Sequence, residues 1–316
     1  MDPFEKAQIG KTGPHVTRLG LGARGIVDPS VDVPDAEAVA TVEKALEIGV
    51  RYIDTAPVYG LGRSESFVGR VISRVERDSY VLSTKVGRLL DPTAARGWFW
   101  DFSRDSVRRS LESSLERLCL DSVDILYIHS PDAHYEQAMS EAFPALAEMR
   151  AQGVVKAIGV GITNWQVALR FAQEGDFDCF LLAGRYTLLD QTAQQGFMSY
   201  CQEHNISVVI GGPYNSGILA SDLGPQALYD YRRAPVEILE RARRIRRVCD
   251  RYGVPLKAAA LQFVLGHPAV ASVIPGSSYP EHVEENAEMV HHPIPPKLWE
   301  ELRQERLISV DAPVPQ

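Results

Sequence analysis

The sequence predicts a closed (β/α)8 barrel, an α/β fold of the TIM type, and three observations predict it. Eight short apolar runs recur along the 316 residues. Most of them are rich in valine and isoleucine without alternation, as expected for strands that are buried on both faces. Helical patterns separate the runs at spacings of about thirty residues, which is typical of βαβ units. Because such barrels commonly exceed about 250 residues and we find no linker, we expect a single domain over residues 1–316.

The predicted strands are apolar runs bounded by glycine or by polar residues. They cover residues 18–22, 51–56, 80–86, 123–130, 155–160, 178–184, 206–212 and 271–276. Helices with recognisable ends are predicted between them at 34–49, 103–121 and 141–153, with Ser103 as an N-cap and Gly49 and Gly153 as stops. An open doubly wound sheet is the alternative that this pattern leaves open.

Two segments depart from the alternation. Residues 1–17 precede the first barrel strand and predict an N-terminal hairpin around the sequence GKTG. Residues 212–256 hold an extra loop and an arginine-rich helix, so we expect additional helices in the C-terminal part of the chain. The run RARRIRRVCDR at 241–251 is interpreted as a solvated helix face.

Composition argues against several classes of function. The net charge is -8, from 33 basic and 41 acidic residues, and no basic face of the kind that binds nucleic acid is evident. No run approaches the roughly 20 apolar residues of a membrane span, and the N-terminus lacks an apolar signal core. The four cysteines are far apart and form no CxxC pair, which predicts buried free thiols in a reducing compartment. We therefore expect a cytoplasmic protein with no nucleic-acid or membrane partner.

The sequence GLGARG at 20–25 matches the glycine fingerprint of dinucleotide-binding folds. That fingerprint requires a helix to begin at its third glycine, so that the helix N-terminus faces a pyrophosphate. Here the sequence IVDPSVDVP follows, and its two prolines predict a loop. The match therefore fails the structural requirement of the motif, and we reject a Rossmann interpretation.

Polar residues stand at the ends of three successive predicted strands. Asp54 ends the second strand and Tyr59 follows it, Lys85 lies in the third, and His129 lies in the fourth. Active sites of these barrels form at the carboxyl ends of the strands. Taken singly, each residue has a structural explanation as an ion pair, a core histidine or a packing tyrosine. Together at one mouth they indicate a site, with Asp54 and Lys85 paired because an isolated buried charge is costly.

These residue types fit acid–base chemistry at an alcohol or carbonyl. A phenol has a pKa of about 10, and a nearby ammonium favours the phenolate and lowers that pKa. We therefore expect Lys85, held by Asp54, to lower the pKa of Tyr59 and make it a general acid/base. His129 would donate a hydrogen bond to the same substrate oxygen. The spacing in HSPDAH at 129–134 fits no usual zinc site, and we expect no metal.

The motifs DTAPVYGLGRSE, LSTKVG, DILYIHS and VIPGSSYPEHVEEN, in this order, resemble those of the aldo-keto reductase superfamily. The resemblance covers nearly the whole chain. It implies a (β/α)8 barrel that binds a nicotinamide cofactor, and a catalytic tetrad of Asp54, Tyr59, Lys85 and His129. Further motifs, among them FDCFLLAGRYTLLDQ and GGPYNSGIL, are similar to the aldose 1-dehydrogenases of the L-fucose or D-threo-aldose type and, more distantly, to L-galactose dehydrogenase.

The resemblance also implies a set of cofactor-binding residues in the loops after the first, fifth, seventh and eighth strands. The set comprises Gly22, Ala23, Thr163, Asn164, Gly211, Gly212, Pro213, Tyr214, Asn215, Ser216, Gly217, Pro275, Gly276, Ser277, Ser278, His282, Glu285 and Asn286. The chain departs from the wider superfamily around the nicotinamide. Gly211 stands where many relatives have a stacking tyrosine, with Tyr214 nearby, and Ala183 stands where a glutamine is usual.

The same segment bears on the choice of cofactor. Members that prefer NADPH commonly carry a lysine after the Ile-Pro of this segment and an arginine six positions later, which grip the 2′-phosphate. This chain has Gly276 and His282 at those positions, with Glu281 adjacent. A phosphate dianion favours a guanidinium and is repelled by a carboxylate. We therefore expect NAD to be preferred, with NADP possible.

The function implied by the resemblance is the oxidation of an aldose such as L-fucose, L-galactose or D-arabinose at C1 to the lactone. Trp98 and Trp100, in the sequence RGWFWDF, are candidates to stack on the sugar, and packing of the loop on the barrel rim is the alternative. Pyridoxal oxidation and NAD(P)H-dependent aldehyde or ketone reduction remain open. A cofactor-binding regulatory subunit is the alternative of another class. We expect a small-molecule sugar or aldehyde substrate and a monomer or weak homo-oligomer.

Overall fold

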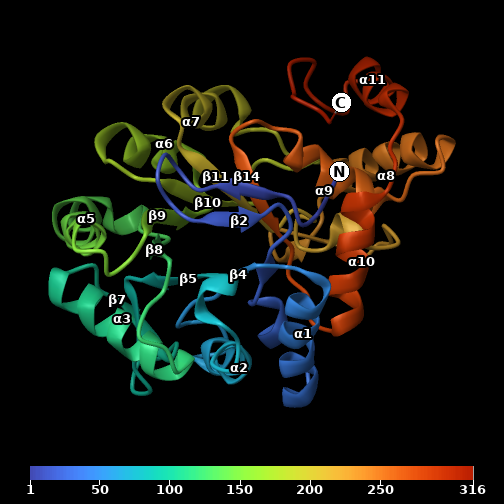
Figure 1. Ribbon diagram of the computed structural model, residues 1–316. Coiled ribbons are helices and arrows are strands. Elements are labelled where there is room, and N and C mark those ends of the chain that lie inside the picture. The colour runs from blue at the N-terminus through green and yellow to red at the C-terminus, as the bar shows by residue number, and fades with distance from the viewer. Residues whose placement is uncertain (316) are drawn as a thin grey trace.

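In the computed structural model, which describes residues 1–315, eight strands form one parallel sheet in the order β14-β11-β10-β9-β8-β5-β4-β3. Parallel bridges from Leu19 to Val273 and from Gly22 to Gly276 connect the two ends of this sheet and close it. The predicted (β/α)8 barrel is thereby confirmed, and Figure 1 shows helices around the central strands. The strands are β3 (Leu21–Gly22), β4 (Tyr52–Asp54), β5 (Val81–Val86), β8 (Ile125–His129), β9 (Ala157–Ile162), β10 (Cys179–Ala183), β11 (Ser207–Gly211) and β14 (Val270–Ile274).

Helices cover the outside of the barrel. The longer ones are α1 (Asp35–Ile48), α2 (Arg63–Ile72), α3 (Arg104–Leu118), α5 (Phe143–Ala151), α6 (Trp165–Glu174), α8 (Val236–Arg251), α9 (Leu256–Leu265), α10 (Pro280–His291) and α11 (Pro296–Gln304). The predicted ends hold for α1, which stops at Gly49 with a φ of 108°, and for α3, whose N-cap Ser103 accepts a hydrogen bond from the Ser106 amide. The predicted helix at 141–153 begins earlier than expected, because α4 (Tyr135–Gln137) runs into α5 through a π-helical turn at Ala138–Ala142.

The N-terminal hairpin is confirmed, and it lies at one end of the barrel. β1 (Lys6–Gln8) and β2 (His15–Thr17) pair antiparallel. Ile9 and Val16 of this hairpin are fully buried and belong to the same cluster as Tyr52 and Tyr127 of the barrel strands. The hairpin therefore closes the amino-terminal end of the barrel with apolar side chains and leaves the opposite end as the open mouth.

The arginine-rich run lies on α8, but its face is not simply solvated. Arg243 and Arg246 donate to the carbonyls of Leu223 and Asp222, which belong to the segment after β11. Arg251 pairs with Glu301 on α11. These arginines thus connect the additional C-terminal helices to the loop that precedes α8.

Three of the four cysteines, Cys179, Cys201 and Cys249, are buried free thiols as expected, whereas Cys119 is exposed. Cys119 occupies the left-handed C-cap of α3, a position at the end of the helix where the chain turns into solvent. No helix in residues 1–315 is both long enough and apolar enough to span a bilayer.

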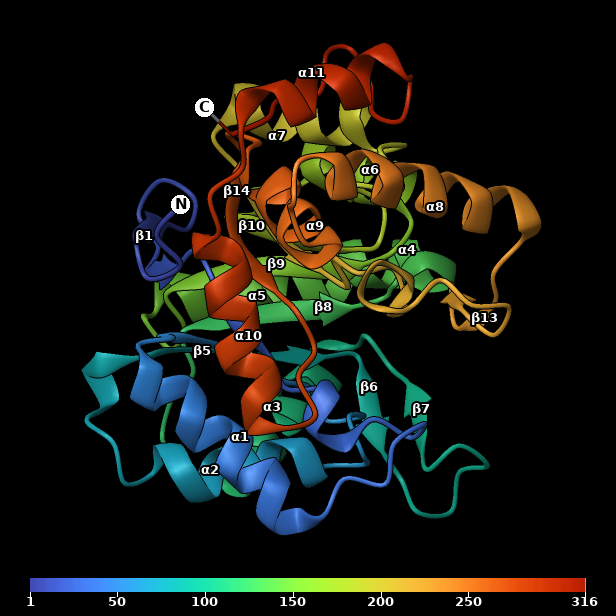
Figure 2. The same cartoon turned by 90° about the vertical axis from the view of Figure 1, so that its right-hand side faces the viewer.

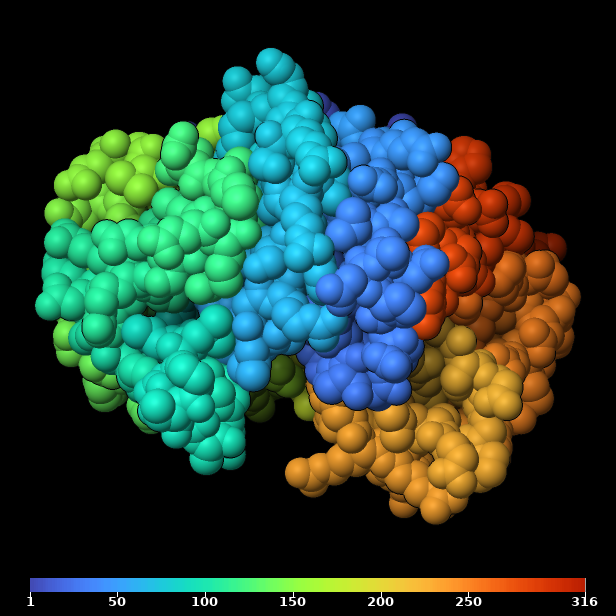
Figure 3. Space-filling view, turned by 90° about the horizontal axis from the view of Figure 1, so that it is seen from below, coloured from blue at the N-terminus to red at the C-terminus, as the bar shows by residue number. Residues whose placement is uncertain are grey.

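Two antiparallel hairpins extend the mouth, and the sequence pattern did not predict them. β6 (Arg88–Leu90) pairs with β7 (Trp98–Trp100) after β5, and β12 (Leu228–Tyr229) pairs with β13 (Arg232–Arg233) after β11. Figure 2 shows β6, β7 and β13 projecting on the same side of the molecule. In Figure 3 the surface is hollowed between the teal segment that contains β7 and the gold segment that precedes α8.

Candidate active site

The four residues of the predicted tetrad meet at the mouth of the barrel. Asp54 is the last residue of β4, Lys85 lies near the end of β5, and His129 is the last residue of β8. Parallel pairing sets Asp54 beside Ser83 and Lys85 beside Tyr127, so that these strand ends lie at one level. The structure therefore brings the sequence-predicted side chains together.

Asp54 and Lys85 form a buried ion pair. The Lys85 Nζ lies 2.8 and 2.7 Å from the two carboxylate oxygens of Asp54, and it also donates to the Thr55 carbonyl at 2.7 Å. Ser83 donates to the same carboxylate at 2.7 Å. The side chains of Lys85 and Asp54 are only 1% and 3% exposed. Three acceptors thus fix the ammonium group, and the expected pairing is confirmed.

Burial and charge act in opposite directions on this pair. Burial alone would lower the pKa of Lys85, but Asp54 and Tyr59 more than offset it, so that the pKa of the ammonium is raised. Burial likewise raises the pKa of Asp54, against the lowering by Lys85 and Ser83. We regard the pair as ionised, because its short charge-assisted hydrogen bonds satisfy both groups.

Tyr59 lies beside the ammonium in the turn that follows β4. Its amide donates to the Ala56 carbonyl at 3.1 Å, and its carbonyl accepts from the Ser64 amide at the start of α2 at 3.2 Å. Gly60 comes next with a φ of 58°, and a Cβ there would lie 2.9 Å from Val27. Only glycine suits this crowded left-handed position. The turn places the ring so that the Lys85 Nζ is 4.9 Å from its centroid.

The prediction that the pKa of Tyr59 is lowered is wrong for the protein without a bound ligand. Burial and the nearby Asp54 carboxylate both raise the pKa of Tyr59. The Lys85 ammonium lowers this pKa, but by less than the combined increase. Tyr59 is partly exposed, so that solvent screens some of the increase. The lysine still acts in the predicted direction, but burial is the larger influence on this phenol.

His129 completes the group. Its ring is 5.9 Å from the Tyr59 ring, centroid to centroid, in an edge-on arrangement at 87°. Burial lowers the pKa of His129 well below its usual value, and Arg88 and Lys85 lower it further. The imidazole is therefore neutral near pH 7 and carries a single N–H. Its buried Nδ1 has no hydrogen-bond partner within residues 1–315.

A buried carboxylate that sequence reasoning missed supports the turn around Tyr59. Glu65, in the first turn of α2, is fully buried. It accepts from Thr84 of β5 at 2.6 Å and from Arg117 of α3 at 2.7 Å. The glutamate of the RSE sequence therefore ties α2 to the strand that carries Lys85. The sequence indicates this role of Glu65 only by placing a charged residue on the apolar face of an amphipathic helix.

The β6–β7 hairpin forms an aromatic wall beside the tetrad. The rings of Trp98 and Trp100 are 4.6 Å apart, centroid to centroid, at 78°. Trp100 is 39% exposed. The Arg88 guanidinium lies 4.9 Å from the Trp98 ring. The two candidate substrate residues thus pack on each other and on an arginine at the rim.

A cavity of about 640 Å³ adjoins the mouth, within the usual range for small-molecule and cofactor sites. Most of the predicted cofactor segment borders it. The predicted residues that line it are Gly212, Pro213, Tyr214, Ser216, Gly217, Gly276, Ser278, His282, Glu285 and Asn286. Tyr214 donates to Asn286 at 2.6 Å, and Asn286 donates to Ser277 at 3.2 Å. These bonds connect the loop after β11 to α10 across the base of the cavity.

The other predicted cofactor residues lie outside this lining. Thr163 and Asn164 border a separate cavity at the mouth, and Asn164 caps α6 by accepting from the amides of Gln166 and Val167. Asn215 is buried and bonded to Thr187 and Gly184. The remaining ones, which belong to strand ends or lie next to the lining, are Gly22, Ala23, Gly211, Pro275 and Ser277.

Several residues of the cavity were not predicted. Arg24, Asp28 and Ser30 come from the loop after β3, and Lys257 comes from α9. Lys257 donates to both carboxylate oxygens of Glu285 at 2.7 Å. Arg24 belongs to the GLGARG sequence and lies just past the first strand. This position could have indicated a residue of the site, because loops at the carboxyl ends of the strands line the mouth.

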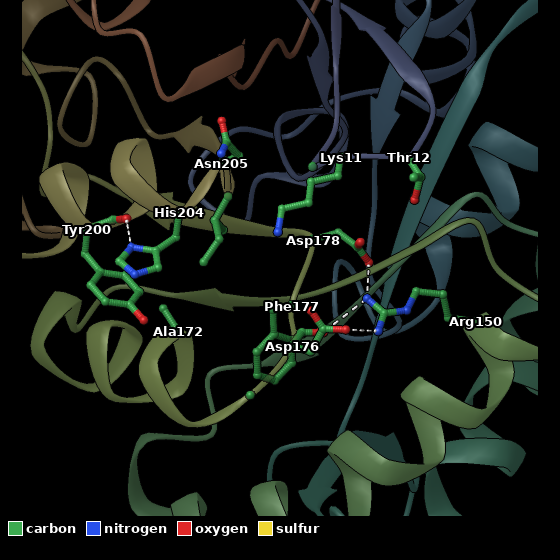
Figure 4. A pocket seen from close by; sticks show the side chains of 13 residues that line it. Lys11, Thr12, Arg150, Ala172, Asp176, Phe177, Asp178, Tyr200, His204 and Asn205 are labelled. Carbon is green, nitrogen blue, oxygen red and sulfur yellow. Dashed lines mark hydrogen bonds and ion pairs between the residues drawn. The ribbon is translucent and has the colours of Figure 1, made fainter.

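Another cavity, of about 360 Å³, lies at the opposite end of the barrel, where Asp178 and Ile206 precede β10 and β11. Figure 4 shows that Arg150 of its lining is already paired with two carboxylates. Arg150 bonds to Asp176 and Asp178 at 2.7 and 2.8 Å. None of the predicted site residues lies there, and it is remote from the tetrad.

The fold and the site together define a class of protein: a (β/α)8-barrel oxidoreductase with a lysine–aspartate pair beside a tyrosine and a histidine. The chain belongs to the aldo/keto reductase family, whose model matches residues 18–305. Members of this family use nicotinamide cofactors.

Curated relatives match the chain over nearly its whole length. It is 40% identical to D-threo-aldose 1-dehydrogenase from a Pseudomonas species, over 94% of this chain and 96% of the relative. It is 39% identical to pyridoxal 4-dehydrogenase from Microbacterium luteolum, over 96% and 98%. It is 30% identical to L-galactose dehydrogenase from Arabidopsis thaliana, over 92% and 89%.

Solved structures agree with this assignment. The holo form of an aldo-keto reductase from Bacillus halodurans superposes with a TM-score of 0.81 at 25% identity, covering 99% of this chain and 98% of that one. The resemblance stated from the motifs is thus confirmed, including the similarity to aldose dehydrogenases.

We expect Asp54→Asn to lower the free energy of unfolding by about 3–5 kcal/mol, because it leaves the Lys85 ammonium buried without a counter-charge. Chemical denaturation followed by circular dichroism measures this loss. The control is Asp35→Asn, which breaks the exposed pair with Arg63 and should cost less than about 1 kcal/mol. An Asp54→Asn protein as stable as the control would contradict the ion pair.

Proposed function

We propose that this protein oxidises the hydroxyl-bearing carbon of a cyclic hemiacetal to a lactone, with hydride transfer to a nicotinamide cofactor. An aldose oxidised at C1 is the first candidate substrate. The observation that carries the proposal is the buried Lys85–Asp54 pair facing Tyr59 and His129 at the barrel mouth. The relative named D-threo-aldose 1-dehydrogenase supports it.

In the proposed reaction Tyr59 is the general base. The anomeric O–H bond breaks and its proton passes to the Tyr59 oxygen, while the electron pair left on oxygen forms the C=O bond of the lactone. The hydrogen on C1 leaves with its electron pair as hydride. A bound oxidised nicotinamide would supply the hydride acceptor.

Lys85 and Asp54 act on Tyr59 in this proposal. Because burial raises the pKa of the phenol, the ammonium is needed to limit the increase and to stabilise the phenolate. Asp54 holds the ammonium in place with both carboxylate oxygens. The neutral imidazole of His129 donates its N–H to the substrate oxygen and orients it opposite the phenol.

The cavity lined by the segments after β11 and β14 fits the cofactor in this proposal. Its volume and its glycines Gly212, Gly217 and Gly276 suit a nucleotide, and a Cβ at Gly217 would meet no atom within 4 Å. Arg24 is its least restrained cation, with a 3.8 Å contact to Asp28 and a stacking contact of 4.8 Å with Tyr231. We propose that Arg24 contacts the cofactor phosphates.

Pyridoxal is the second candidate substrate. In water, its aldehyde closes with the neighbouring hydroxymethyl group to a cyclic hemiacetal, so the same chemistry gives a lactone. The relative named pyridoxal 4-dehydrogenase and the aromatic wall of Trp98 and Trp100 favour it. Aromatic rings stack on a pyridine ring as well as on the apolar face of a sugar.

We expect Tyr59→Phe to reduce kcat by at least about a hundredfold, because the general base is removed, while the dissociation constant for the cofactor changes little. Steady-state kinetics with L-fucose, L-galactose, D-arabinose and pyridoxal, together with cofactor fluorescence titration, measure both quantities. Tyr200→Phe, in the remote cavity, is the matched control.

A Tyr59→Phe protein with undiminished kcat would contradict the proposed base. The alternative of a regulatory subunit makes a different prediction for the unaltered protein, which would bind cofactor tightly without turnover on any substrate. A 27% identical relative, described as a probable voltage-gated potassium channel subunit beta from Arabidopsis thaliana, favours keeping this alternative.

We further expect kcat/KM with NAD⁺ to exceed that with NADP⁺ by about tenfold or more, because Gly276 and His282 stand where NADPH-preferring relatives commonly carry a lysine and an arginine, and Glu281 is adjacent. Position 276 is glycine, and Lys257 is already bound by Glu285. Initial rates with both cofactors test this. A higher kcat/KM with NADP⁺ would contradict this expectation and would indicate that Arg24 or His282 binds the 2′-phosphate.

A further inference from the structure

Arg88 lies at the mouth without a role in the tetrad. It is the first residue of β6, follows Gly87 at the end of β5, and pairs across the hairpin with Trp100. Gly87 has a φ of 97°, so the chain turns sharply between Lys85 and Arg88. The hairpin therefore starts within three residues of the tetrad lysine and holds Arg88 at the rim.

The guanidinium of Arg88 is stacked but not hydrogen-bonded. It lies 4.9 Å from the Trp98 ring and 5.9 Å from the Trp100 ring. Its Nε is buried and has no hydrogen-bond partner. Within residues 1–315, no carboxylate lies within salt-bridge distance of Arg88, and no carbonyl accepts a hydrogen bond from it.

Several other half-buried arginines of the chain are paired with carboxylates. Arg117 bonds to Glu65 at 2.7 Å. Arg150 and Arg185 likewise each reach a carboxylate at 2.8 Å. A guanidinium remains charged at any physiological pH, and a partly desolvated charge without a partner costs free energy. Arg88 therefore differs from these three arginines, because its contacts with protein groups are with aromatic rings.

The charge of Arg88 acts on the reacting groups. It contributes to the lowered pKa of His129, after burial. Burial lowers the pKa of Arg88 itself, against the opposing influence of Tyr59 and Asp132. By geometry, Arg88 follows Lys85 by three residues across the sharp turn at Gly87, so it lies at the same barrel mouth as the tetrad.

We propose that Arg88 binds an anionic oxygen of the substrate, and that the substrate is a cyclic hemiacetal that carries such an oxygen. This inference rests on the proposed function. A guanidinium forms paired hydrogen bonds with a carboxylate. The anionic oxygen has two possible sources: the carboxylate of an aldouronic acid and the phenolate of pyridoxal. Trp98 and Trp100 hold the guanidinium in place by cation–π contacts and leave its N–H groups free for the ligand.

The test compares each anionic substrate with a neutral analogue. D-galacturonate is paired with D-galactose, and pyridoxal with 3-O-methylpyridoxal. With the unaltered protein we expect a higher kcat/KM for the anionic member of at least one pair, and the pair that shows it identifies the source. In Arg88→Met, the KM for that anionic substrate should rise by about tenfold to a hundredfold, whereas kinetics with the neutral member should change little.

Arg96→Met is the matched control, because Arg96 contacts the same two tryptophan rings at 5.9 and 5.5 Å but is exposed. It should leave every KM within about threefold of the original value. Arg88→Lys keeps the charge and should restore part of the affinity for the anion. Circular dichroism and cofactor titration confirm that each variant is folded.

Equal losses for the anionic and neutral members in Arg88→Met would overturn the inference, since that pattern indicates a packing role. So would a higher kcat/KM for both neutral substrates with the unaltered protein. Quenching of tryptophan fluorescence by D-galacturonate or pyridoxal gives a readout that does not require turnover. Quenching that depends on Arg88, without oxidation of any of the four compounds, would support the anion site and refute the proposed function.

Discussion

A lysine and an aspartate buried together at the end of two neighbouring strands determine the chemistry available at the mouth of this barrel. Neither charge is tolerable alone in that position, and the ion pair, with Ser83 and the Thr55 carbonyl, satisfies both. The ammonium is thereby fixed under the ring of Tyr59. The pKa of the Tyr59 phenol depends on the balance between this ammonium, which favours ionisation, and burial, which opposes it.

The rest of the fold positions that pair. Closure of the sheet between Gly22 and Gly276 brings the first and last strands together, so the cavity that fits a cofactor adjoins the strand ends that carry the tetrad. Glu65 fixes α2 against β5 and so supports the Tyr59 turn. The two antiparallel hairpins then rise on one side of the mouth (Figure 2). One of them carries Arg88 and the tryptophans, which places recognition of the substrate next to the reacting groups.

Much of this arrangement could be predicted from sequence, because the barrel follows from apolar runs alternating with helices and the tetrad follows from charges at strand ends. The β6–β7 hairpin could not, since Arg88–Leu90 is too short to give a periodic signal. The early start of the helix before α5 depends on a π-helical turn that no residue type marks. The pKa of Tyr59 could not be predicted, because sequence reveals a neighbouring charge but not the degree of burial that competes with it.

The Lys85 ammonium lowers the pKa of the Tyr59 phenol, which burial would otherwise raise further. Carbon-13 NMR of protein labelled at the tyrosine Cζ, titrated with pH, measures that pKa directly once Tyr59→Phe has identified the signal. We expect Tyr59 to titrate at higher pH in Lys85→Met than in the unaltered protein, because the phenolate loses its counter-charge. An identical midpoint in the two folded proteins would contradict it.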